Sequence, residues 1–172
     1  LPEESRKQHF QSLRQCFDLG LDDIGVISTI LLPGCELESQ ASRNQHGIQT
    51  RYRLRQGMYG EYDDFKSMDP EEIIRAHHRL SEKEMESLRP LHWLIWYGWN
   101  HGFLKPLYRY AHRTARLNPV DLIQGILEEP GIRTERLDAL LAEFARDAAA
   151  EWFETPEALF AFFTSPSRWP EL

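Results

Sequence analysis

The stretch SLRPLHWLIWYGWNHGFLKPLY, residues 87–108, holds three of the chain's five tryptophans and has no charged side chain between Arg89 and Lys105. At helical spacing, apolar or aromatic residues fall on almost every side of it, which predicts a helix buried on most sides. The uncharged run is shorter than the roughly 20 apolar residues that cross a bilayer, and it contains Asn100 and His101. We therefore expect a helix of a protein core rather than a membrane span.

Five residues inside this stretch are unusual for a buried helix. Gly98 and Gly102 lie four positions apart, where the lack of side chains predicts a flat strip for the close approach of another backbone or of a ligand. His92, Asn100 and His101 are polar, and each of them costs about 1 to 3 kcal/mol if it finds no hydrogen-bond partner. Two interpretations stay open: these groups bond to neighbouring backbone, or they form part of a pocket wall.

The composition limits the class of protein. The 172 residues suffice for one sizeable domain, or for a domain with a further fragment, and 41% hydrophobic residues are enough for a core. The net charge of -7 argues against general nucleic-acid binding. Cys16 and Cys35 are too few and too far apart for a zinc or iron–sulfur motif, and no stretch resembles a signal peptide. The expected location is the reducing cytoplasm.

Charged residues are segregated along the chain. Between Ser87 and Val120 there are five cations and no carboxylate, whereas carboxylates dominate from Asp121 onward. Opposite blocks of charge can pair within one molecule, and a basic block can instead bind an anionic ligand. A basic helix expected over 107–117 is the candidate surface for such a ligand.

The segment from Ile24 to Leu32, IGVISTILL, is an almost unbroken apolar run rich in β-branched residues. Such a run predicts a strand covered on both faces, as in a parallel sheet. It follows an amphipathic helix expected over 3–19 and ends at Pro33 and Gly34. Parallel strands need neighbours joined by crossovers. Later segments supply few, so we expect the neighbours to lie upstream of residue 1.

The residues after this segment alternate between helical and extended patterns. A short polar helix or turn is expected over 36–46, closed by Gly47, and a strand over 48–54. The glycines at 57 and 60 predict a loop. Asp69 to Glu72 has the features of a helix start, but the IIRAHH that follows fits a strand, and local signals leave both open.

The second half of the chain reads as a series of helices. Ser81 and Glu84 form a capping box at the start of the aromatic helix. Pro90 is expected to kink or break that helix. Trp169 is expected to dock the last residues of the chain. Further helices are predicted over 107–117, 119–127, 134–153 and 156–163.

Several short phrases occur in a distinctive order: LPEES at residues 1–5, LLPGCELES at 31–39, HGIQTRYRL at 46–54, GMYGEYDDF at 57–65 and LRPLHWLIWYGWNHGFL at 88–104. In order and spacing they resemble the later part of radical S-adenosylmethionine enzymes, particularly the subgroup that carries an upstream cobalamin-binding domain. The resemblance covers about residues 1–105 of the chain.

The resemblance is made up of separate motif matches. Residues 1–5 look like a Gly-Leu-Pro-Gly-Glu-Thr loop in which Glu replaces the second glycine. Pro33, Gly34, Glu36 and Leu37 resemble a Pro-Gly-x-Glu-Leu phrase. The remaining matches are Ser42 with Arg43, then Gly47, Ile48, Thr50, Tyr52 and Arg53 in a Tyr-Gly-Ile-x-Thr-x-Tyr-Arg phrase, and Arg89 with His92 in an Arg-x-x-His aromatic helix.

The resemblance implies an α+β fold, mainly α, in which the last α/β turns of a partial (β/α) barrel are followed by a helical C-terminal extension. The implied parts are the end of the barrel at 1–38, a connecting α/β segment at 39–80 and a helical domain at 81–172. Such a chain would supply loops on the cofactor side and a helical cap over the substrate of a longer enzyme.

The cofactors implied for the parent protein are S-adenosylmethionine and a [4Fe-4S] cluster, with cobalamin as a further candidate. The family holds its cluster on a Cys-x-x-x-Cys-x-x-Cys loop, which this chain lacks. The chain alone is therefore expected to be inactive, and neither a catalytic nor a metal-binding residue is assigned to it. The implied partners are the upstream portion of the same polypeptide and a small-molecule or peptide substrate.

Family analogy also selects candidate site residues. The candidates for cofactor binding are Glu4, Pro33, Gly34, Glu36 and Glu38. The candidates for the substrate side are Arg43, Arg51, Arg53, Arg89, His92 and Asn100. Each of these arginines can equally be an ordinary salt-bridge partner.

Two rival functions remain. The first is a non-catalytic, mostly helical binding module that recognises an anionic partner through the basic helix from Lys105 to Arg116. The second is a nucleic-acid binder that uses the same arginines, against which the overall acidity argues. Neither a membrane nor a nucleic acid is expected among the partners.

Overall fold

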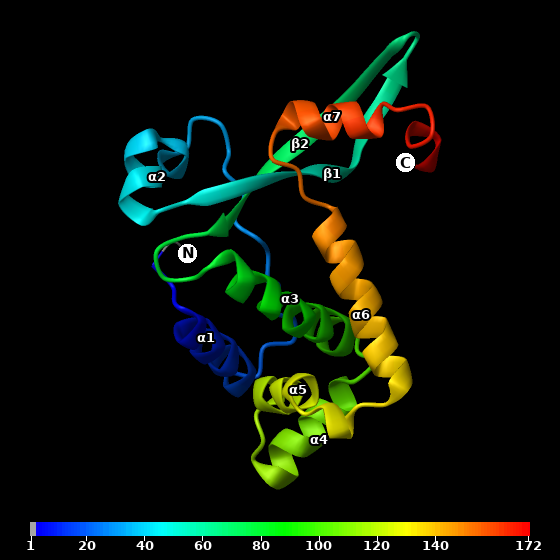
Figure 1. Cartoon of the computed structure of the whole chain (residues 1–172). Coiled ribbons are helices and arrows are strands. Elements are labelled where there is room, and N and C mark those ends of the chain that lie inside the picture. Colours follow the sequence, from blue (N-terminus) through cyan, green and yellow to red (C-terminus); the bar gives the residue numbers. More distant parts are fainter. Residues whose placement is uncertain (1–2) are drawn as a thin grey trace. The chain divides into compact units, whose positions relative to one another are not determined.

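A computed structural model describes residues 3–172 and has an α+β fold in which helices predominate, which confirms the expected fold class at that level (Figure 1). The chain forms two compact units. The sheet unit contains Ser28–His78 and Asp147–Leu172, and the helical unit contains Glu3–Ile27 and Arg79–Arg146. Each unit is therefore assembled from segments that are far apart in the sequence.

The sheet unit is built on two antiparallel strands, β1 (Gln49–Tyr62) and β2 (Phe65–Ala76). The strand expected over 48–54 is confirmed but is longer. The predicted loop at 57–60 is wrong, because these residues continue β1 past an irregularity between Leu54 and Tyr59. The ambiguous segment after Asp69 is strand rather than helix. Its register opposite β1, with Arg53 facing Glu71, decides between the two local signals.

A short helical region precedes β1. The 3-10 turn η1 (Glu36–Glu38) leads into α2 (Gln40–His46), and the Ser39 side chain caps α2 by accepting a hydrogen bond from the Ser42 backbone N–H. Gly47 ends the helix at φ +62°, in the left-handed region that favours glycine. The predicted short polar helix closed by Gly47 is confirmed.

The C-terminal residues pack against the sheet within the same unit. Helix α7 (Pro156–Phe163) lies across β1 and β2 in Figure 1, and the backbones of Tyr52 and Phe153 exchange two hydrogen bonds of 2.8 Å. Trp169, at the start of η4 (Trp169–Glu171), donates its indole N–H to Glu61 over 2.7 Å. The expected docking of the tail by Trp169 is confirmed.

The strand predicted from Ile24 to Leu32 is not formed as a strand. These residues are extended, and within residues 3–172 the bridge from Ile30 to Ile73 of β2 is the one ladder contact that they make. That bridge is antiparallel, so the expected parallel pairing is wrong. The physical reason is that the apolar run has no parallel neighbour within the described residues.

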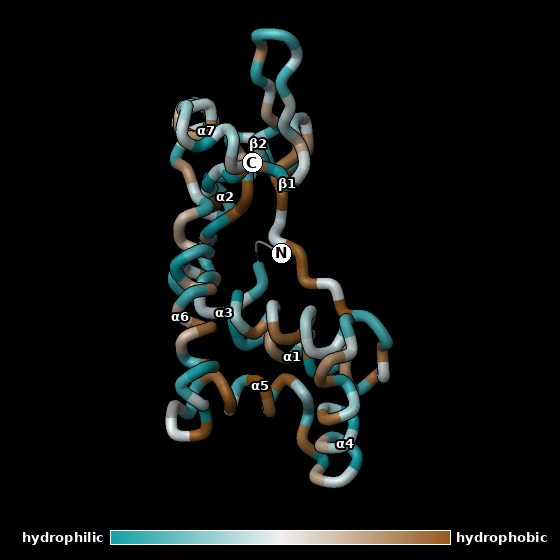
Figure 2. The backbone as a smooth tube through the Cα atoms, turned by 90° about the vertical axis from the view of Figure 1, so that its right-hand side faces the viewer, coloured by the Kyte–Doolittle hydropathy of each residue, from teal (hydrophilic) through white to brown (hydrophobic). Residues whose placement is uncertain are grey.

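The helical unit surrounds one hydrophobic core. Its helices are α1 (Arg6–Asp18), α3 (Glu82–Ile95), α4 (Lys105–Ala115) and α5 (Pro119–Glu128), and α5 packs against the other three. The 3-10 turn η3 (Pro130–Ile132) leads into α6 (Glu135–Ala150), which runs on into the sheet unit. In Figure 2 hydrophilic and hydrophobic segments alternate along the helices, the pattern of amphipathic helices with one buried face. The predicted helices are confirmed, with shifted ends.

The aromatic stretch begins as predicted and then departs from an α-helix. The capping box is present, since Ser81 and Glu84 each accept a hydrogen bond from the other's backbone N–H. Helix α3 runs through Pro90, so of the kink or break expected there, the break does not occur. It continues as the π-helical turn η2 (Trp96–Asn100). Because a π turn shifts the helical phase, Trp99 points into the core while Trp96 and Tyr97 are exposed.

Gly98 and Gly102 have different roles in this turn. A Cβ on Gly98 would lie 2.8 Å from the Tyr108 hydroxyl oxygen, so the missing side chain makes room for the buried Tyr108 of α4. Gly102 has φ +83° and ends the turn, with open space where its Cβ would be. The close approach predicted for this strip therefore occurs at Gly98, and the approaching group is a side chain of the same unit.

We expect Gly47→Ala to destabilise the sheet unit by about 1 to 2 kcal/mol, the cost of a left-handed backbone for a residue with a Cβ. The exposed His78 ring, whose Nδ1 would lie 2.6 Å from that Cβ, would also have to turn aside. Gly125→Ala is the matched control: it lies within α5 with open space around it, so it should stabilise by roughly 0.5 to 1 kcal/mol. Urea unfolding measures both. Equal stability of the two variants would contradict this explanation.

Candidate functional site

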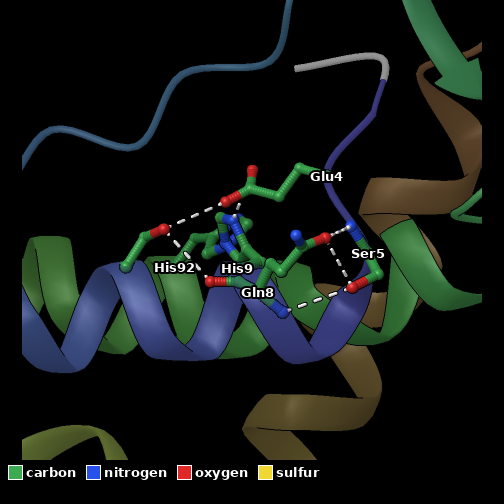
Figure 3. A network of polar contacts seen from close by, with 6 residues as sticks. Glu4, Ser5, Gln8, His9 and His92 are labelled. Atoms are coloured by element: carbon green, nitrogen blue, oxygen red, sulfur yellow. Dashed lines mark hydrogen bonds and ion pairs between the residues drawn. The ribbon is translucent and has the colours of Figure 1, made fainter.

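A polar network in the helical unit joins Glu4 to His92 through His9 (Figure 3). The capping box of Ser5 and Gln8 fixes the first turn of α1 and places Glu4 just before it. The Glu4 Oε2 atom lies 3.3 Å from His9 Nδ1, and His9 Nε2 lies 2.7 Å from His92 Nε2 of α3. A cofactor-side candidate and a substrate-side candidate are thus connected by a residue that sequence reasoning missed.

The order of donors in this network follows from the carboxylate. An ionised carboxylate only accepts, so its hydrogen bond with His9 requires a proton on His9 Nδ1. When His9 is neutral, its Nε2 is an acceptor and His92 donates its Nε2–H. When His9 is protonated, the direction between the two rings reverses. With a neutral His9 the donors therefore point toward Glu4, since His92 donates to His9 and His9 donates to the carboxylate.

The environment keeps His92 neutral. Burial, together with His9 and the Arg89 guanidinium, lowers the pKa of His92 to about 3. The imidazole is therefore uncharged at neutral pH and in weak acid. It can hold a hydrogen bond at this position, but it does not take up a proton from water near pH 7.

We expect the helical unit to lose stability in acid because of His92. The unfolded side chain binds a proton near pH 6.5 and the folded one only near pH 3, so the free energy of unfolding falls as pH falls between these values. The loss should reach about 2 kcal/mol or more by pH 4.5. Urea unfolding of wild type and His92→Gln across this range measures it. An unchanged pH slope in the variant would rule out His92 as the cause.

Asn100 holds the start of the extended segment within the helical unit. Its Oδ1 accepts from the Ile24 backbone N–H over 3.0 Å, and its Nδ2 donates to the Ile24 carbonyl oxygen over 3.1 Å. The amide satisfies both backbone groups of one residue, as a neighbouring strand would. Of the two interpretations for this side chain, bonding to nearby backbone is confirmed.

The Pro33–Glu38 turn, which carries the other cofactor candidates, lies in the sheet unit. Gly34 has φ +80° with open space where a Cβ would be, and its backbone N–H donates to the Glu38 carboxylate. Glu36 begins η1 within this turn. Because Glu4 belongs to the helical unit, the structure divides the five predicted cofactor residues between two units.

Arg43 is held by a two-pronged ion pair with Glu72 of β2. Its Nη1 and Nη2 donate to Oε1 and Oε2 over 2.7 and 3.0 Å, and its Nε donates to the Glu38 carbonyl oxygen over 2.9 Å. The Thr50 hydroxyl donates to the same carboxylate over 2.6 Å. Arg43 therefore ties α2 and the Pro33–Glu38 turn to the sheet.

Two opposing effects act on the Glu72 carboxyl. Burial would raise its pKa, but the hydrogen bonds from Arg43 and Thr50 outweigh this effect and place the pKa below its usual value. The hydrogen bond with Glu72 in turn raises the pKa of Arg43. The pair is ionised at neutral pH, so the fork of Arg43 is already occupied by a carboxylate of the protein itself.

The other arginine candidates also have partners inside their own units. Arg51 lies 3.1 Å from a Glu154 oxygen, and Arg53 lies 3.1 Å from a Glu71 oxygen. The Arg89 guanidinium lies 6.0 Å from the centre of the Phe144 ring. The salt-bridge interpretation left open for these residues describes the contacts of Arg43, Arg51 and Arg53.

The structure brings the predicted site residues together in two separate groups. The sheet unit contains Pro33, Gly34, Glu36, Glu38, Arg43, Arg51 and Arg53, whereas the helical unit contains Glu4, Arg89, His92 and Asn100. Sequence reasoning missed His9 and Glu72. No local signal pointed to them, because they meet their partners across 83 and 29 positions of sequence.

The basic residues of α4 border an open groove of about 500 Å³ in the helical unit. Lys105 donates to the Asp22 carbonyl oxygen over 2.7 Å, and Arg109 donates to the Asp22 carboxylate over 3.0 Å. Both cations also lie over the ring of Trp99. The groove residues are Gly102, Lys105, Pro106, Arg109, Tyr110, Arg113 and Thr114.

Arg43→Ala should destabilise the sheet unit by about 2 to 3 kcal/mol, because it leaves the half-buried Glu72 carboxylate without its main partner. Arg43→Lys should restore little of this, since an ammonium cannot form the two-pronged contact. The matched control is Arg55→Ala, which removes an exposed pair with Asp69 and should cost under about 1 kcal/mol. Urea unfolding compares them, and similar losses for Arg43→Ala and Arg55→Ala would contradict a structural role for Arg43.

Comparison with protein-family models and with curated proteins gives no match to this chain. Within residues 3–172, no group of three or more His, Cys, Asp or Glu side chains is arranged to hold a metal ion. In the same residues, helices with the length and apolar character needed to cross a membrane do not occur.

Proposed function

We propose that this chain is the C-terminal portion of a radical S-adenosylmethionine enzyme, of the subgroup with an upstream cobalamin-binding domain. In this proposal the extended segment is the last strand of the partial barrel, and the helices form a cap over the substrate. The order of the motifs from LPEES to the aromatic helix supports the assignment to this family. The partial exposure and sparse backbone pairing of residues 24–32 support their role as a barrel strand.

The observation on which the proposal rests is that an apolar, strand-like segment is covered only in part. Ile24 and Leu31 are buried, whereas Ile27 and Leu32 are 80% and 62% exposed. Residues 24–32 are extended, and their contacts include the bridge at Ile30 and the amide of Asn100 at Ile24. A parallel sheet from upstream residues would pair this backbone and bury these side chains.

The proposal assigns S-adenosylmethionine to the Pro33–Glu38 turn of the sheet unit, and Glu4 of the helical unit stays a separate candidate. Gly34 lets a ligand approach the backbone closely, because it has no Cβ and open space at that side. The carboxylates of Glu4, Glu36 and Glu38 match the ammonium and sulfonium charges of this cofactor. The substrate side is assigned to Arg43, Arg51, Arg53, Arg89, His92 and Asn100.

The iron–sulfur cluster does not fit the residues of this chain. Cluster ligation in this family uses three cysteines of one loop, whereas this chain has two, Cys16 in α1 and Cys35 just before η1. The proposal therefore places the cluster upstream and derives no step of the reaction from the residues present here. Cobalamin is likewise assigned to the upstream domain.

The test uses the full-length polypeptide. The reading frame should encode a Cys-x-x-x-Cys-x-x-Cys motif upstream of Leu1. After anaerobic reconstitution with iron and sulfide, the protein should convert S-adenosylmethionine to 5'-deoxyadenosine when a reductant is added. Absence of the motif, or a reconstituted cluster without 5'-deoxyadenosine, would overturn the proposal.

A residue-level test of the same proposal compares two glutamates of the sheet unit. Glu38→Gln should raise the KM for S-adenosylmethionine by about tenfold with the cluster absorbance unchanged, because a neutral amide loses one charge-assisted contact. Glu157→Gln, at an exposed position of α7, is the control and should behave as wild type. Equal KM values in both variants would remove the Pro33–Glu38 turn from the cofactor site.

A second candidate function is a non-catalytic binding module that recognises an anionic partner through the basic helix at 105–116. The groove bordered by Lys105, Arg109 and Arg113 favours it. A full-length polypeptide without the three-cysteine motif would support this candidate over the first.

A further inference from the structure

The sequence places the aromatic stretch in a core, but several of its large side chains are exposed to solvent. Trp96 is 50% exposed and Phe103 is 64% exposed. On α4, Leu107 and Tyr110 are 52% and 66% exposed. Exposed apolar groups of this size gathered in one region mark an interaction surface more often than chance exposure.

Several of these side chains are neighbours along η2 and α4 of the helical unit. The rings of Tyr97 and Phe103 are stacked at 4.6 Å, and Phe103 is followed by the residues that border the groove of α4. Tyr110 lies on the side of α4 opposite the buried Tyr108, and Leu107 lies between the two around the helix. We call Trp96, Tyr97, Phe103, Leu107 and Tyr110, together with Lys105, Arg109 and Arg113, the aromatic–basic face.

Basic side chains outnumber acids at this face, since three cations belong to it and Asp22 pairs with two of them. From residue 87 to residue 120 the chain has five cations and no carboxylate. Asp22 is the acid that meets Lys105 and Arg109 there. Arg113 is exposed at the other end of the groove. A partner for the face must therefore offer negative charge beside an apolar layer.

We propose that the aromatic–basic face docks on an anionic phospholipid surface, with lipid phosphates in the groove of α4 and the exposed rings at the boundary between headgroups and acyl chains. Indole and phenol rings favour that boundary because they are apolar with one polar group. Lys and Arg side chains near an anionic leaflet add attraction to each headgroup. Leu107 favours a lipid surface over a nucleic acid, which offers no hydrocarbon layer to an aliphatic side chain, whereas an aromatic ring could also stack on bases.

Such docking is attachment at a surface and not a membrane span. The expectation of no membrane partner came from the shortness of the uncharged run, which limits spanning but not peripheral binding. The inference does not depend on the radical chemistry, because the residues of the face are not among the cofactor or substrate candidates. Loss of lipid binding and loss of 5'-deoxyadenosine formation are therefore separate observations.

The experiment is co-sedimentation of the full-length polypeptide with vesicles of phosphatidylcholine alone and of phosphatidylcholine with about one third phosphatidylglycerol. Binding should be at least about tenfold stronger to the anionic vesicles and should weaken at high salt. Arg113→Glu and the double variant Phe103→Ser, Tyr110→Ser should each lower binding by about tenfold. All of these positions are exposed, so folding, checked by circular dichroism, should be retained.

Matched controls come from exposed residues of the same unit outside the face. Arg136→Glu makes the same charge change on α6, and Ile132→Ser removes an apolar side chain that is 68% exposed. Both should bind vesicles as wild type does. A second measurement can be made on the wild-type protein. Its tryptophan fluorescence should shift to shorter wavelength when anionic vesicles are added, and most of this shift should be absent in Trp96→Phe.

Three results would overturn the proposal. The first is no sedimentation with either vesicle. The second is equal binding to both vesicle types, or the same decrease in vesicle binding for the variants of the face and for the two control variants. The third is tighter binding to a single-stranded oligonucleotide than to vesicles, with oligonucleotide affinity lowered by Arg113→Glu and unchanged in the Phe103→Ser, Tyr110→Ser variant. This result would favour a nucleic-acid partner instead.

Discussion

The close approach of Tyr108 to Gly98 is the contact on which the helical unit depends. Burial of the phenol, which raises the pKa of Tyr108 to about 12, requires the space that a side chain at position 98 would fill. With Tyr108 in place, α4 folds back against η2, and Trp99 points inward to meet Phe17 of α1. The indole N–H of Trp99 then donates to the Leu21 carbonyl oxygen, so the same contact also fixes the chain beyond α1.

The sheet unit depends on charge pairing more than on a large core. On the strands Arg53 of β1 lies opposite Glu71 of β2. Arg51 pairs with Glu154 and Arg43 pairs with Glu72, each joining a segment outside the sheet to one of its strands. Because these carboxylates engage the arginines, the side chains first considered for substrate binding are already used by the fold. Any anionic substrate on this side would have to compete with a carboxylate that is held in place.

Short-range patterns predicted the elements that depend on short-range contacts. The capping box at Ser81, the left-handed cap at Gly47 and the helix that starts at Pro119 were readable because each depends on residues within one turn. The contacts of His9 with His92 and of Arg43 with Glu72 were not readable, since they join distant segments. The phase shift of η2 was also missed, because a period of 3.6 residues assumes a regular helix through residue 100.

The tight fit of the His78 ring against Gly47 has a consequence for how this protein can vary. The space that a Cβ would take at position 47 is occupied by the imidazole, although the two residues are 31 positions apart in the sequence. Because His78 is exposed, its ring can turn aside, so the left-handed backbone is the stronger limit on residue 47. Among descendants of this sequence, position 47 should therefore keep glycine or change to asparagine, whereas position 78 should accept more kinds of residue.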